Sequence, residues 1–306
     1  MKRTLLLLLG PCLLFSSCVK KEQSEHTRTI GVALLTRSHL FYKDLEEGLR
    51  EEAARQKYEL IVSSAEFDLG KQISQIEDFV TRKVDAIIVC PVDSKGIGPG
   101  IRKANLAGIP VFTADIAAQE GTVVSHIASD NVAGGRLAGE YLAKALGGKG
   151  AVAIINNPIA TSVLDRVKGF REALAAFPGI TIVADVSGQA VRDKSLEVTA
   201  DVLQSNPRLD GIFGINDASA LGALDAVQQF KRPGIIIVGY DATTIAVNAI
   251  LKGTALKADV IQYPKKIGTL TIEKIHDHFV GLPVPPIVPV EVGITDAASL
   301  AKVGVQ

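Results

Sequence analysis

Short β-branched runs alternate with longer amphipathic segments along most of this chain, and that alternation constrains the fold more than any other feature. The apolar runs predict strands at residues 30–35, 59–63, 86–90, 110–113, 123–127, 151–155, 180–186, 211–215, 235–238 and 256–261. Helical periodicity lies between and after them, at residues 41–56, 70–82, 101–107, 132–146, 162–176, 196–204, 218–230, 245–251 and 265–280. This order predicts an α/β protein whose parallel sheets carry helices on both faces.

The number of strands favours two doubly wound domains over one very wide sheet, and the 306-residue length allows two cores. The break is expected near Ser129 and Asp130, where a strand is followed by a new helical series. The proline-rich segment 283–289 cannot form a helix or a central strand, because proline lacks the N–H group that both need. We expect this segment to be a fixed connector at the junction of the two domains.

The start of the chain has the composition of an export signal. Lys2 and Arg3 precede an apolar run at residues 5–15, which is shorter than the ~20 residues that a helix needs to cross a bilayer. Two serines then lead directly into Cys18. A secretory signal with an incidental cysteine is one reading of this order. Such a signal places the protein outside the cytoplasm, whether or not the cysteine has a role of its own.

The same segment resembles the signal of bacterial lipoproteins, although Phe15 stands where that pattern usually has leucine. The resemblance implies cleavage of residues 1–17, a diacylglycerol group on the Cys18 thiol, and a localisation in the cell envelope, on a membrane and facing the periplasm or the cell exterior. The polar residues 18–28 then form a tether between the lipid and the first domain. In that reading the lipid alone contacts the membrane.

Charge and cysteine content exclude several classes of function. The whole chain has 33 basic and 33 acidic residues, and loss of Lys2 and Arg3 with the leader leaves a net charge of about −2, which gives no electrostatic reason to bind nucleic acid. Cys90 ends an apolar run and is expected to be a small buried residue without a disulfide.

Motifs of the common catalytic sites are missing from the sequence. It contains no phosphate-binding G-x-x-x-x-G-K-[ST] loop and no G-x-S-x-G nucleophile elbow, and the glycines at 96–100 do not match G-x-G-x-x-G. His276 and His278 lie two apart on a predicted helix, so they face different directions and make a poor metal pair. We therefore expect no cofactor, no metal and no catalysis, with an exported enzyme of unfamiliar type as the remote alternative.

Polar and aromatic side chains gather where the predicted strands end, which is where open α/β sheets bind ligands. The residues in question are His39, Phe41, Tyr42, Asp115, Arg166, Asn216, Asp241 and Gln262. Carboxylates, amides and a guanidinium can hydrogen-bond hydroxyl groups, and aromatic faces can cover C–H surfaces, so the set suits a polyhydroxylated ligand. For Asp130, Asn131 and Asp217, which precede predicted helices, N-capping is favoured over binding, and for Asp241 the two roles are evenly weighted.

Four stretches in order resemble the periplasmic ribose-binding proteins and their sugar-binding relatives: residues 123–131, 216–224, 238–241 and 261–264. The resemblance covers about residues 29–292. It implies two Rossmann-like lobes joined by three hinge crossovers, near residues 129–130, 262 and 291–292. The N-terminal lobe is then formed by residues 29–129 plus 263–291, and the C-terminal lobe by residues 130–262 plus 292–306.

The resemblance also implies a sugar site, which this sequence matches in part. Phe41 and Tyr42 match its stacking aromatics, and the polar ring is matched by Asp115, Arg166, Asn216, Asp241 and Gln262. Three positions depart from the pattern: His39 replaces an asparagine, Ile116 replaces a second arginine, and an alanine, Ala190, falls near a third aromatic. The class of ligand is therefore a monosaccharide or polyol, while ribose itself stays open.

The family resemblance implies a monomeric solute-binding component of an ABC sugar importer, with permease subunits as partners. The alternative in the same fold is a ligand sensor that docks a receptor kinase or chemoreceptor. The effector domain of a repressor is disfavoured, because an export signal stands where a DNA-binding headpiece is expected.

Overall fold

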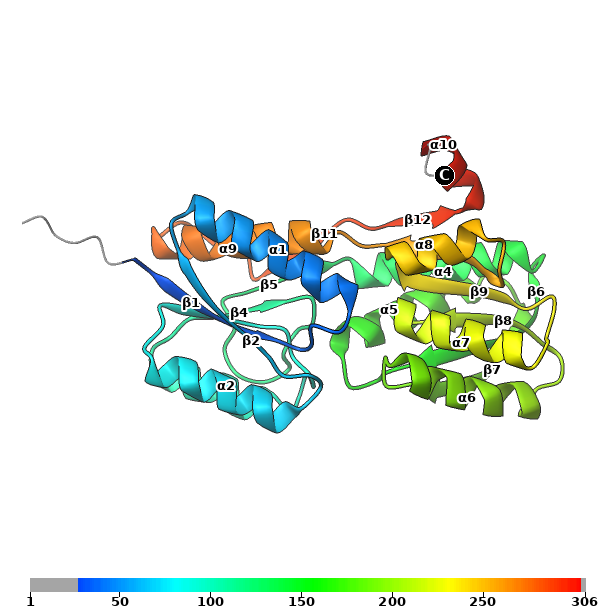
Figure 1. The fold of residues 1–306 in the computed structure, drawn as a ribbon, viewed down its shortest axis with the longest axis horizontal. Helices are drawn as coiled ribbons and strands as arrows, with labels where there is room; N and C mark the ends of the chain where they lie inside the picture. The colour runs from blue at the N-terminus through cyan, green and yellow to red at the C-terminus, as the bar shows by residue number, and fades with distance from the viewer. Residues whose placement is uncertain (1–26, 304–306) are drawn as a thin grey trace, which may run out of the picture.

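The computed structural model describes residues 27–303, so the predicted leader, Cys18 and most of the tether lie outside the described residues. The chain forms two α/β lobes along the long axis of the molecule (Figure 1). The strands of the first lobe are β1 (Thr29–Leu34), β2 (Glu59–Ser64), β3 (Ala86–Val89), β4 (Val111–Ala114), β5 (Ser125–Ser129) and β11 (Ile287–Val290). Its helices are α1 (Leu40–Arg55), α2 (Leu69–Thr81), α3 (Gly98–Leu106) and α9 (Pro264–Phe279).

The second lobe repeats this plan. Its strands are β6 (Lys149–Asn156), β7 (Gly179–Ser187), β8 (Leu209–Gly214), β9 (Ile236–Asp241), β10 (Leu256–Ile261) and β12 (Gly293–Asp296). Its helices are α4 (Asn131–Ala145), α5 (Thr161–Leu174), α6 (Arg192–Ser205), α7 (Asp217–Gln229), α8 (Thr244–Leu251) and α10 (Ala297–Val303). The sheet orders β11-β5-β4-β3-β1-β2 and β12-β10-β9-β8-β6-β7 correspond strand by strand. Only the edge strands differ, since β11 pairs parallel with β5 and β12 pairs antiparallel with β10.

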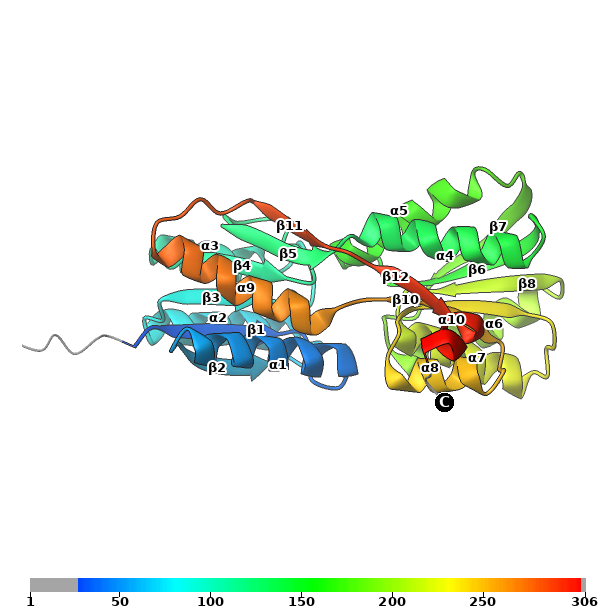
Figure 2. The ribbon, with the colours of Figure 1, turned by 90° about the horizontal axis from the view of Figure 1, so that it is seen from above.

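The chain passes between the lobes three times, from β5 to α4, from β10 to α9 and from β11 to β12 (Figure 2). The predicted fold of two doubly wound lobes with three crossovers is therefore confirmed. The division into 29–129 plus 263–291 and 130–262 plus 292–306 stays our proposal for the exact boundaries. The crossovers bring the carboxyl ends of the two sheets face to face, which is the arrangement that creates a cleft between lobes.

All ten predicted strands are present, but three further elements were missed. The prediction that 283–289 is only a connector was wrong for its last residues, which form β11 at the edge of the first sheet. An edge position tolerates Pro289 because the missing N–H faces away from the partner strand. The short β12 and α10 follow it. Helix α3 begins at Gly98, earlier than predicted, with Pro99 in its first turn, where the absent N–H costs no intrahelical bond.

Close helix packing positions the polar residues of the second lobe. Helices α4 and α5 approach backbone to backbone because glycine occupies the contact: a Cβ at Gly135 would overlap the Arg166 carbonyl, and a Cβ at Gly169 would overlap the Val132 carbonyl. Phe170 of α5 stacks on Phe213 of β8 with ring centroids 4.5 Å apart. These contacts fix α5 against the sheet and leave its first turns at the carboxyl ends of the strands.

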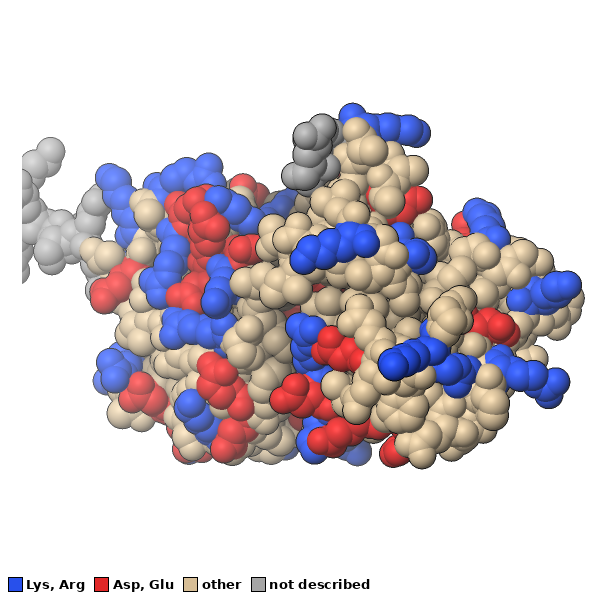
Figure 3. Space-filling model, turned by 45° about the vertical axis from the view of Figure 1, so that its right-hand side comes forward, with Lys and Arg blue, Asp and Glu red and all other residues tan. Residues whose placement is uncertain are grey.

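The surface carries charges of both signs, interspersed on the face seen in Figure 3. On the first lobe, Lys265 of α9 pairs with Glu47 and Glu51 of α1 at 3.1 and 2.8 Å. Exposed pairs of this kind contribute little stability, about 0–1 kcal/mol each. Among the described helices, none is long and apolar enough to cross a membrane.

Candidate ligand-binding site

A cavity of about 470 Å³ lies in the cleft between the lobes. Every residue proposed for the site from the sequence lines it: His39, Phe41, Tyr42, Asp115, Ile116, Arg166, Asn216, Asp241 and Gln262. Ala190, which was aligned loosely, lines it as well. The structure thus brings these residues together, and their role in binding stays our proposal. The volume is in the range of small-molecule sites, ~300–1,000 Å³.

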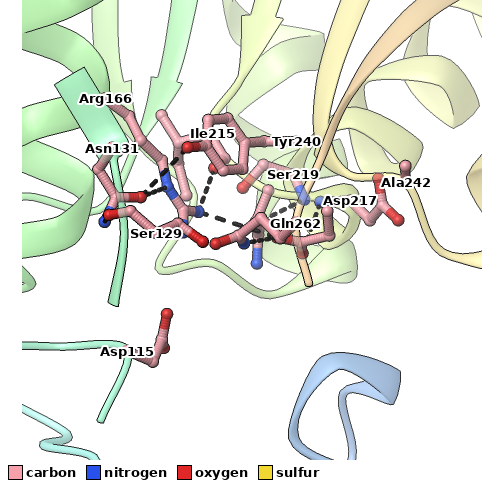
Figure 4. A network of polar contacts seen from close by, with 12 residues as sticks. Asp115, Ser129, Asn131, Arg166, Ile215, Asp217, Ser219, Tyr240, Ala242 and Gln262 are labelled. Atoms are coloured by element: carbon pink, nitrogen blue, oxygen red, sulfur yellow. Dashed lines mark hydrogen bonds and ion pairs between the residues drawn. The ribbon is translucent and has the colours of Figure 1, made fainter. Parts of the chain in front are cut away.

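Arg166 is the centre of a buried polar network in the second lobe (Figure 4). Its Nε donates to Asn131 Oδ1 at 2.8 Å, and its Nη1 donates to the Ile215 carbonyl at 2.8 Å. The guanidinium lies over the Tyr240 ring, 3.9 Å from the centroid, and the Tyr240 hydroxyl donates to the same Asn131 oxygen at 3.2 Å. Only 4% of Arg166 is exposed. The side chain is therefore held in place before any ligand arrives, and it lines the cavity.

Asp241 ends β9 next to this guanidinium. Its Oδ1 lies 3.9 Å from Arg166 Nη1 and accepts a 2.6 Å hydrogen bond from Gln262 Nε2. Burial raises the pKa of Asp241 to about 8, and the nearby charge of Asp217 adds to the shift while Arg166 opposes it. The amide oxygen of Gln262 is buried, and no residue within 27–303 donates a hydrogen bond to it. This side of the cavity therefore offers a carboxyl group and an amide oxygen as acceptors for ligand hydroxyls.

The first lobe presents a smaller polar group and more apolar surface. The Tyr42 hydroxyl donates to Asp115 Oδ2 at 2.7 Å, and burial raises the pKa of both side chains. In Figure 4 Asp115 lies apart from the Arg166 network, on the opposite lobe. Phe41 packs edge to face on Tyr42, with ring centroids 5.2 Å apart. Both aromatics line the cavity.

The three positions that depart from the ribose-binding pattern lie around the cavity. Ile116 is 5% exposed and follows Asp115 directly, so an apolar wall stands beside that carboxylate. His39 precedes α1 without a side-chain capping bond, and burial lowers the pKa of its imidazole. Ala190 lies in the loop before α6 with a left-handed φ of 56°. The apolar side of the cavity is completed by residues that the sequence analysis did not single out: Leu35, Phe67, Val92, Pro158, Ile159 and Val163.

Two of the residues interpreted as N-caps have other roles. Asp130 caps α4, as predicted, by accepting from the Ala133 N–H at 2.9 Å. The cap of α7 is Asn216, not Asp217, and Asn131 is a helical residue that holds Arg166. Sequence position alone could not separate these roles, because Asn and Asp at adjacent positions can each act as a cap. Asp241 does not cap α8, whose N-cap position is Thr243.

The lobes also contact each other directly through the loops at the rim of the cleft. Thr161 Oγ1, at the start of α5, accepts from the Ala117 N–H at 3.0 Å and donates to the Ala117 carbonyl at 3.1 Å. The Thr161 N–H donates to Ser94 Oγ at 3.0 Å, and the Ser94 N–H donates to the Ile159 carbonyl at 3.1 Å. These contacts join segments that follow β3 and β4 in one lobe to the segment that follows β6 in the other.

No constellation for covalent chemistry lies in the cavity. Cys90 is buried, as predicted, its burial raises the thiol pKa, and it forms no disulfide among the described residues. Within residues 27–303, no group of three or more His, Cys, Asp or Glu side chains is arranged to hold a metal ion. What the arrangement offers is hydrogen bonding and aromatic coverage, which are the means of reversible binding.

Comparison with known proteins gives the same picture. Residues 30–282 match the model of the periplasmic binding protein domain. The chain is 35% identical to the ribose import binding protein of Salmonella typhimurium, over 80% of this chain and 82% of that protein. The crystal structure of an ABC transporter solute-binding protein from Actinobacillus succinogenes with bound D-allose is 30% identical, with a TM-score of 0.82 over 90% of this chain and all of the other. The myo-inositol binding protein of Caulobacter is 28% identical, with a TM-score of 0.83 over 90% of this chain and 95% of that protein.

Proposed function

Because the chain belongs to the periplasmic binding protein domain family, we propose that it binds a monosaccharide or polyol between its lobes and delivers it to an ABC importer. The observation that carries the proposal is the cavity itself, where a fixed guanidinium, a buried carboxylate and an unpaired amide oxygen meet stacked aromatics at the carboxyl ends of both sheets. The relatives are binding proteins by name, and we propose the same here: the protein works as a monomer and leaves its ligand chemically unchanged.

The two sides of the cavity suit different parts of such a ligand. Hydroxyl groups donate to Asp241 and to the Gln262 oxygen, while Arg166 donates to ring or hydroxyl oxygens. The faces of Phe41 and Tyr42 cover C–H surface, where contact with an apolar ring face replaces water without loss of hydrogen bonds. A sugar or polyol has both kinds of surface. Inorganic phosphate has no C–H surface for the aromatic side chains to cover.

Ile116 narrows the class of sugar. A ligand hydroxyl that faces this side chain loses its water and gains no partner, at a cost of about 1–3 kcal/mol. We therefore propose that D-ribose binds weakly and that the preferred ligand turns a C–H face or fewer hydroxyls toward Ile116, with His39 supplying a compensating hydrogen bond. Calorimetry should give a ribose dissociation constant weaker than about 10 μM, which corresponds to less than ~7 kcal/mol of binding free energy. Tight ribose binding would overturn this assignment of Ile116, His39 and Ala190.

A thermal-shift panel tests the proposed function. The probes are D-ribose, D-allose, xylitol, D-apiose and myo-inositol, with an amino acid mixture and inorganic phosphate as controls. A ligand at a hundredfold excess over its dissociation constant raises the free energy of unfolding by about 2.7 kcal/mol. We expect one or more sugars or polyols to shift the melting temperature and to be recovered unchanged. Stabilisation by the controls alone, or recovery of a converted sugar, would contradict the proposal.

The lipid anchor is a separate proposal that rests on the order of residues 2–18. One lipid chain with ~0.8 kcal/mol per buried methylene gives reversible attachment, and further chains make it stable. Cys18→Ser should abolish lipid labelling and release the protein in soluble form after expression. Membrane fractionation of this variant that matches the wild type would rule the anchor out and leave the sugar site untouched.

A further inference from the structure

The turn after β9 has an unusual backbone conformation. Asp241 and Ala242 have φ values of 119° and 54°, both in the left-handed half of the map that residues with a Cβ avoid. This turn directs the Asp241 side chain into the cavity before Thr243 begins the approach to α8. Such a conformation persists only when the surrounding structure holds it.

Two buried carboxyl groups hold the backbone of this turn. The Ala242 N–H donates to Asp259 Oδ1 of β10 at 3.0 Å, and the Thr243 N–H donates to Asp217 Oδ2 of α7 at 2.8 Å. Asp259 is fully buried and Asp217 is 5% exposed. Each carboxyl therefore uses one oxygen to fix one N–H of the turn, and each has a second oxygen to satisfy.

The second oxygen of each carboxyl shows how the two acids interact. Asp217 Oδ1 and Asp259 Oδ2 are buried, and none of the described residues donates a hydrogen bond to either of them. After burial, which raises the pKa of both carboxyls, each acid acts on the other: Asp217 raises the pKa of Asp259, and Asp259 lowers the pKa of Asp217, as expected for two carboxyl groups in contact. Carboxylates are acceptors only, so this contact requires a proton on one of the pair. Gly239 lies opposite Asp259 in the sheet, and a Cβ there would overlap Asp259 Oδ2, so the glycine leaves the space that the pair occupies.

We propose that Asp217 and Asp259 share one proton, and that this protonated pair is the positioning device that holds the turn presenting Asp241 to the cleft. Asp259 is the protonated member. The proton donates to Asp217, whose other oxygen accepts from Thr243. That a loosened turn weakens ligand binding rests on the proposed function, whereas the shared proton and its effect on the turn do not.

The charges around the pair agree with this placement of the proton. Burial raises the pKa of both carboxyls. Arg166 of α5 lowers the pKa of Asp217, while Asp241 of β9 raises the pKa of Asp259. The carboxyl near the cation is thus the one that ionises, and the carboxyl near the other acid keeps the proton. Loss of that proton at alkaline pH places two buried carboxylates in contact, and their repulsion loosens the turn.

Asp259→Asn removes the titratable proton and keeps the shape of the side chain. The amide oxygen can still accept from Ala242, and the amide N–H₂ supplies the donor to Asp217 without any titration. Asp259→Ala removes both functions. Infrared spectroscopy of the ligand-free protein at neutral pH reports protonated carboxyl groups, and amide hydrogen exchange at Ala242 and Thr243 reports whether the turn is held.

Because burial keeps Asp241 itself protonated at neutral pH, the band is compared in the Asp241→Asn background: we expect a protonated-carboxyl band in Asp241→Asn that is absent when Asp259→Asn is added to it. Exchange at Ala242 and Thr243, corrected for intrinsic pH dependence, should accelerate at least tenfold in the wild type as the pH is raised until the band disappears. It should stay slow in Asp259→Asn and be fast at every pH in Asp259→Ala.

If Asp259→Asn does not fold, Asp217→Asn tests the same pair, because it also replaces the shared proton with an amide donor. An Asp241→Asn protein without the band, or a band in that background that survives the addition of Asp259→Asn and likewise of Asp217→Asn, would overturn the proposal. None of these measurements involves a sugar, so their failure is distinct from failure of the proposed function.

Discussion

The two lobes share one strand order but bring different chemistry to the cleft. Asp115 and Asp241 stand at equivalent places, at the carboxyl ends of β4 and β9, the third strand from the crossover edge of each sheet. Both have positive φ values, 66° and 119°. Asp241 lies among a guanidinium, an amide donor and two further carboxyls, whereas the only side-chain donor given to Asp115 by the described residues is Tyr42.

This difference indicates a division of labour. The second lobe is a rigid polar surface, because Arg166 is fixed by Asn131, Ile215 and Tyr240 before a ligand arrives. Prearranged donors lose little conformational entropy on binding, so this surface can supply most of the affinity. The first lobe contributes aromatic and apolar side chains with one carboxylate, which discriminate between ligands by shape. The ligand for binding measurements on the variants is the sugar or polyol that gives the largest thermal shift in the panel.

Removing the carboxylate of the second lobe should have the largest effect. Asp241→Ala deletes the acceptor of ligand hydroxyls and leaves Gln262 and Arg166 without their buried partner. We expect binding to weaken by about 2–5 kcal/mol, as found for truncation of one member of a buried charged group. Isothermal titration calorimetry measures the change, with Asp201→Ala on the exposed surface of α6 as the control. Affinity within threefold of the wild type would remove Asp241 from the site.

Loss of the hydrogen bond to the equivalent carboxyl group of the first lobe, Asp115, should have a smaller effect on binding. Tyr42→Phe keeps the aromatic face and deletes only the hydroxyl that donates to Asp115 at 2.7 Å. A hydrogen bond to a charged group contributes about 1.5–3 kcal/mol, and the ligand can replace part of it. We expect binding to weaken by no more than this amount, and by less than in Asp241→Ala.

Tyr58→Phe is the matched control, because its hydroxyl contacts His276 away from the cavity. If Tyr42→Phe weakens binding more than Asp241→Ala, the affinity comes from the first lobe and the proposed division of labour is reversed.

The sequence predicted the fold well because its signals are local and repeated. Strand β3, for example, is a continuous apolar run buried on both faces, and α5 shows the three-to-four-residue spacing of a helix packed on a sheet. The elements that were missed, β11, β12 and α10, are short and lie after the prolines of 283–286, where no run is long enough to show a period. Their pairing depends on the crossover between lobes, which is a tertiary feature.

The site could be predicted only as far as single residues at strand ends. All of the proposed residues line the cavity, yet the sequence did not reveal Asn131 and Tyr240 as the supports of Arg166, because they lie 35 and 74 positions away and meet it only in the fold. Asp259 was also missed, since it lies inside a strand and not at its end. A charged residue in an otherwise apolar run was the one signal available.

The pH dependence of binding tests the acceptor role of Asp241 without a change of shape. Its pKa is raised to about 8, first by burial and then by the charge of Asp217. Ligand hydroxyls that donate to both oxygens of Asp241 need its ionised form, so affinity should rise as the pH approaches about 8. The gain is at most ~1.4 kcal/mol per pH unit below that value. Calorimetry at several pH values measures it, and Asp241→Asn should lose this rise. Affinity that falls as the pH is raised to 8 would show that the protonated carboxyl is the binding form.

The smallest expected effect concerns the contact between the lobes. Thr161→Val removes the hydroxyl that bonds both backbone groups of Ala117, while the Thr161 N–H to Ser94 stays available. Each hydrogen bond contributes about 0.5–1.5 kcal/mol net, and the lost groups regain water when the lobes separate. The closed form is thereby disfavoured relative to the open form, and ligand affinity, which depends on closure, should weaken by a similar amount.

Small-angle scattering at a fixed, subsaturating ligand concentration should show a more extended average shape for Thr161→Val than for the wild type. Thr161→Ser keeps the hydroxyl and serves as the control. Since Thr161 is not among the residues that line the cavity, an effect as large as that of Asp241→Ala would mean that closure, and not the polar surface of the second lobe, sets the affinity.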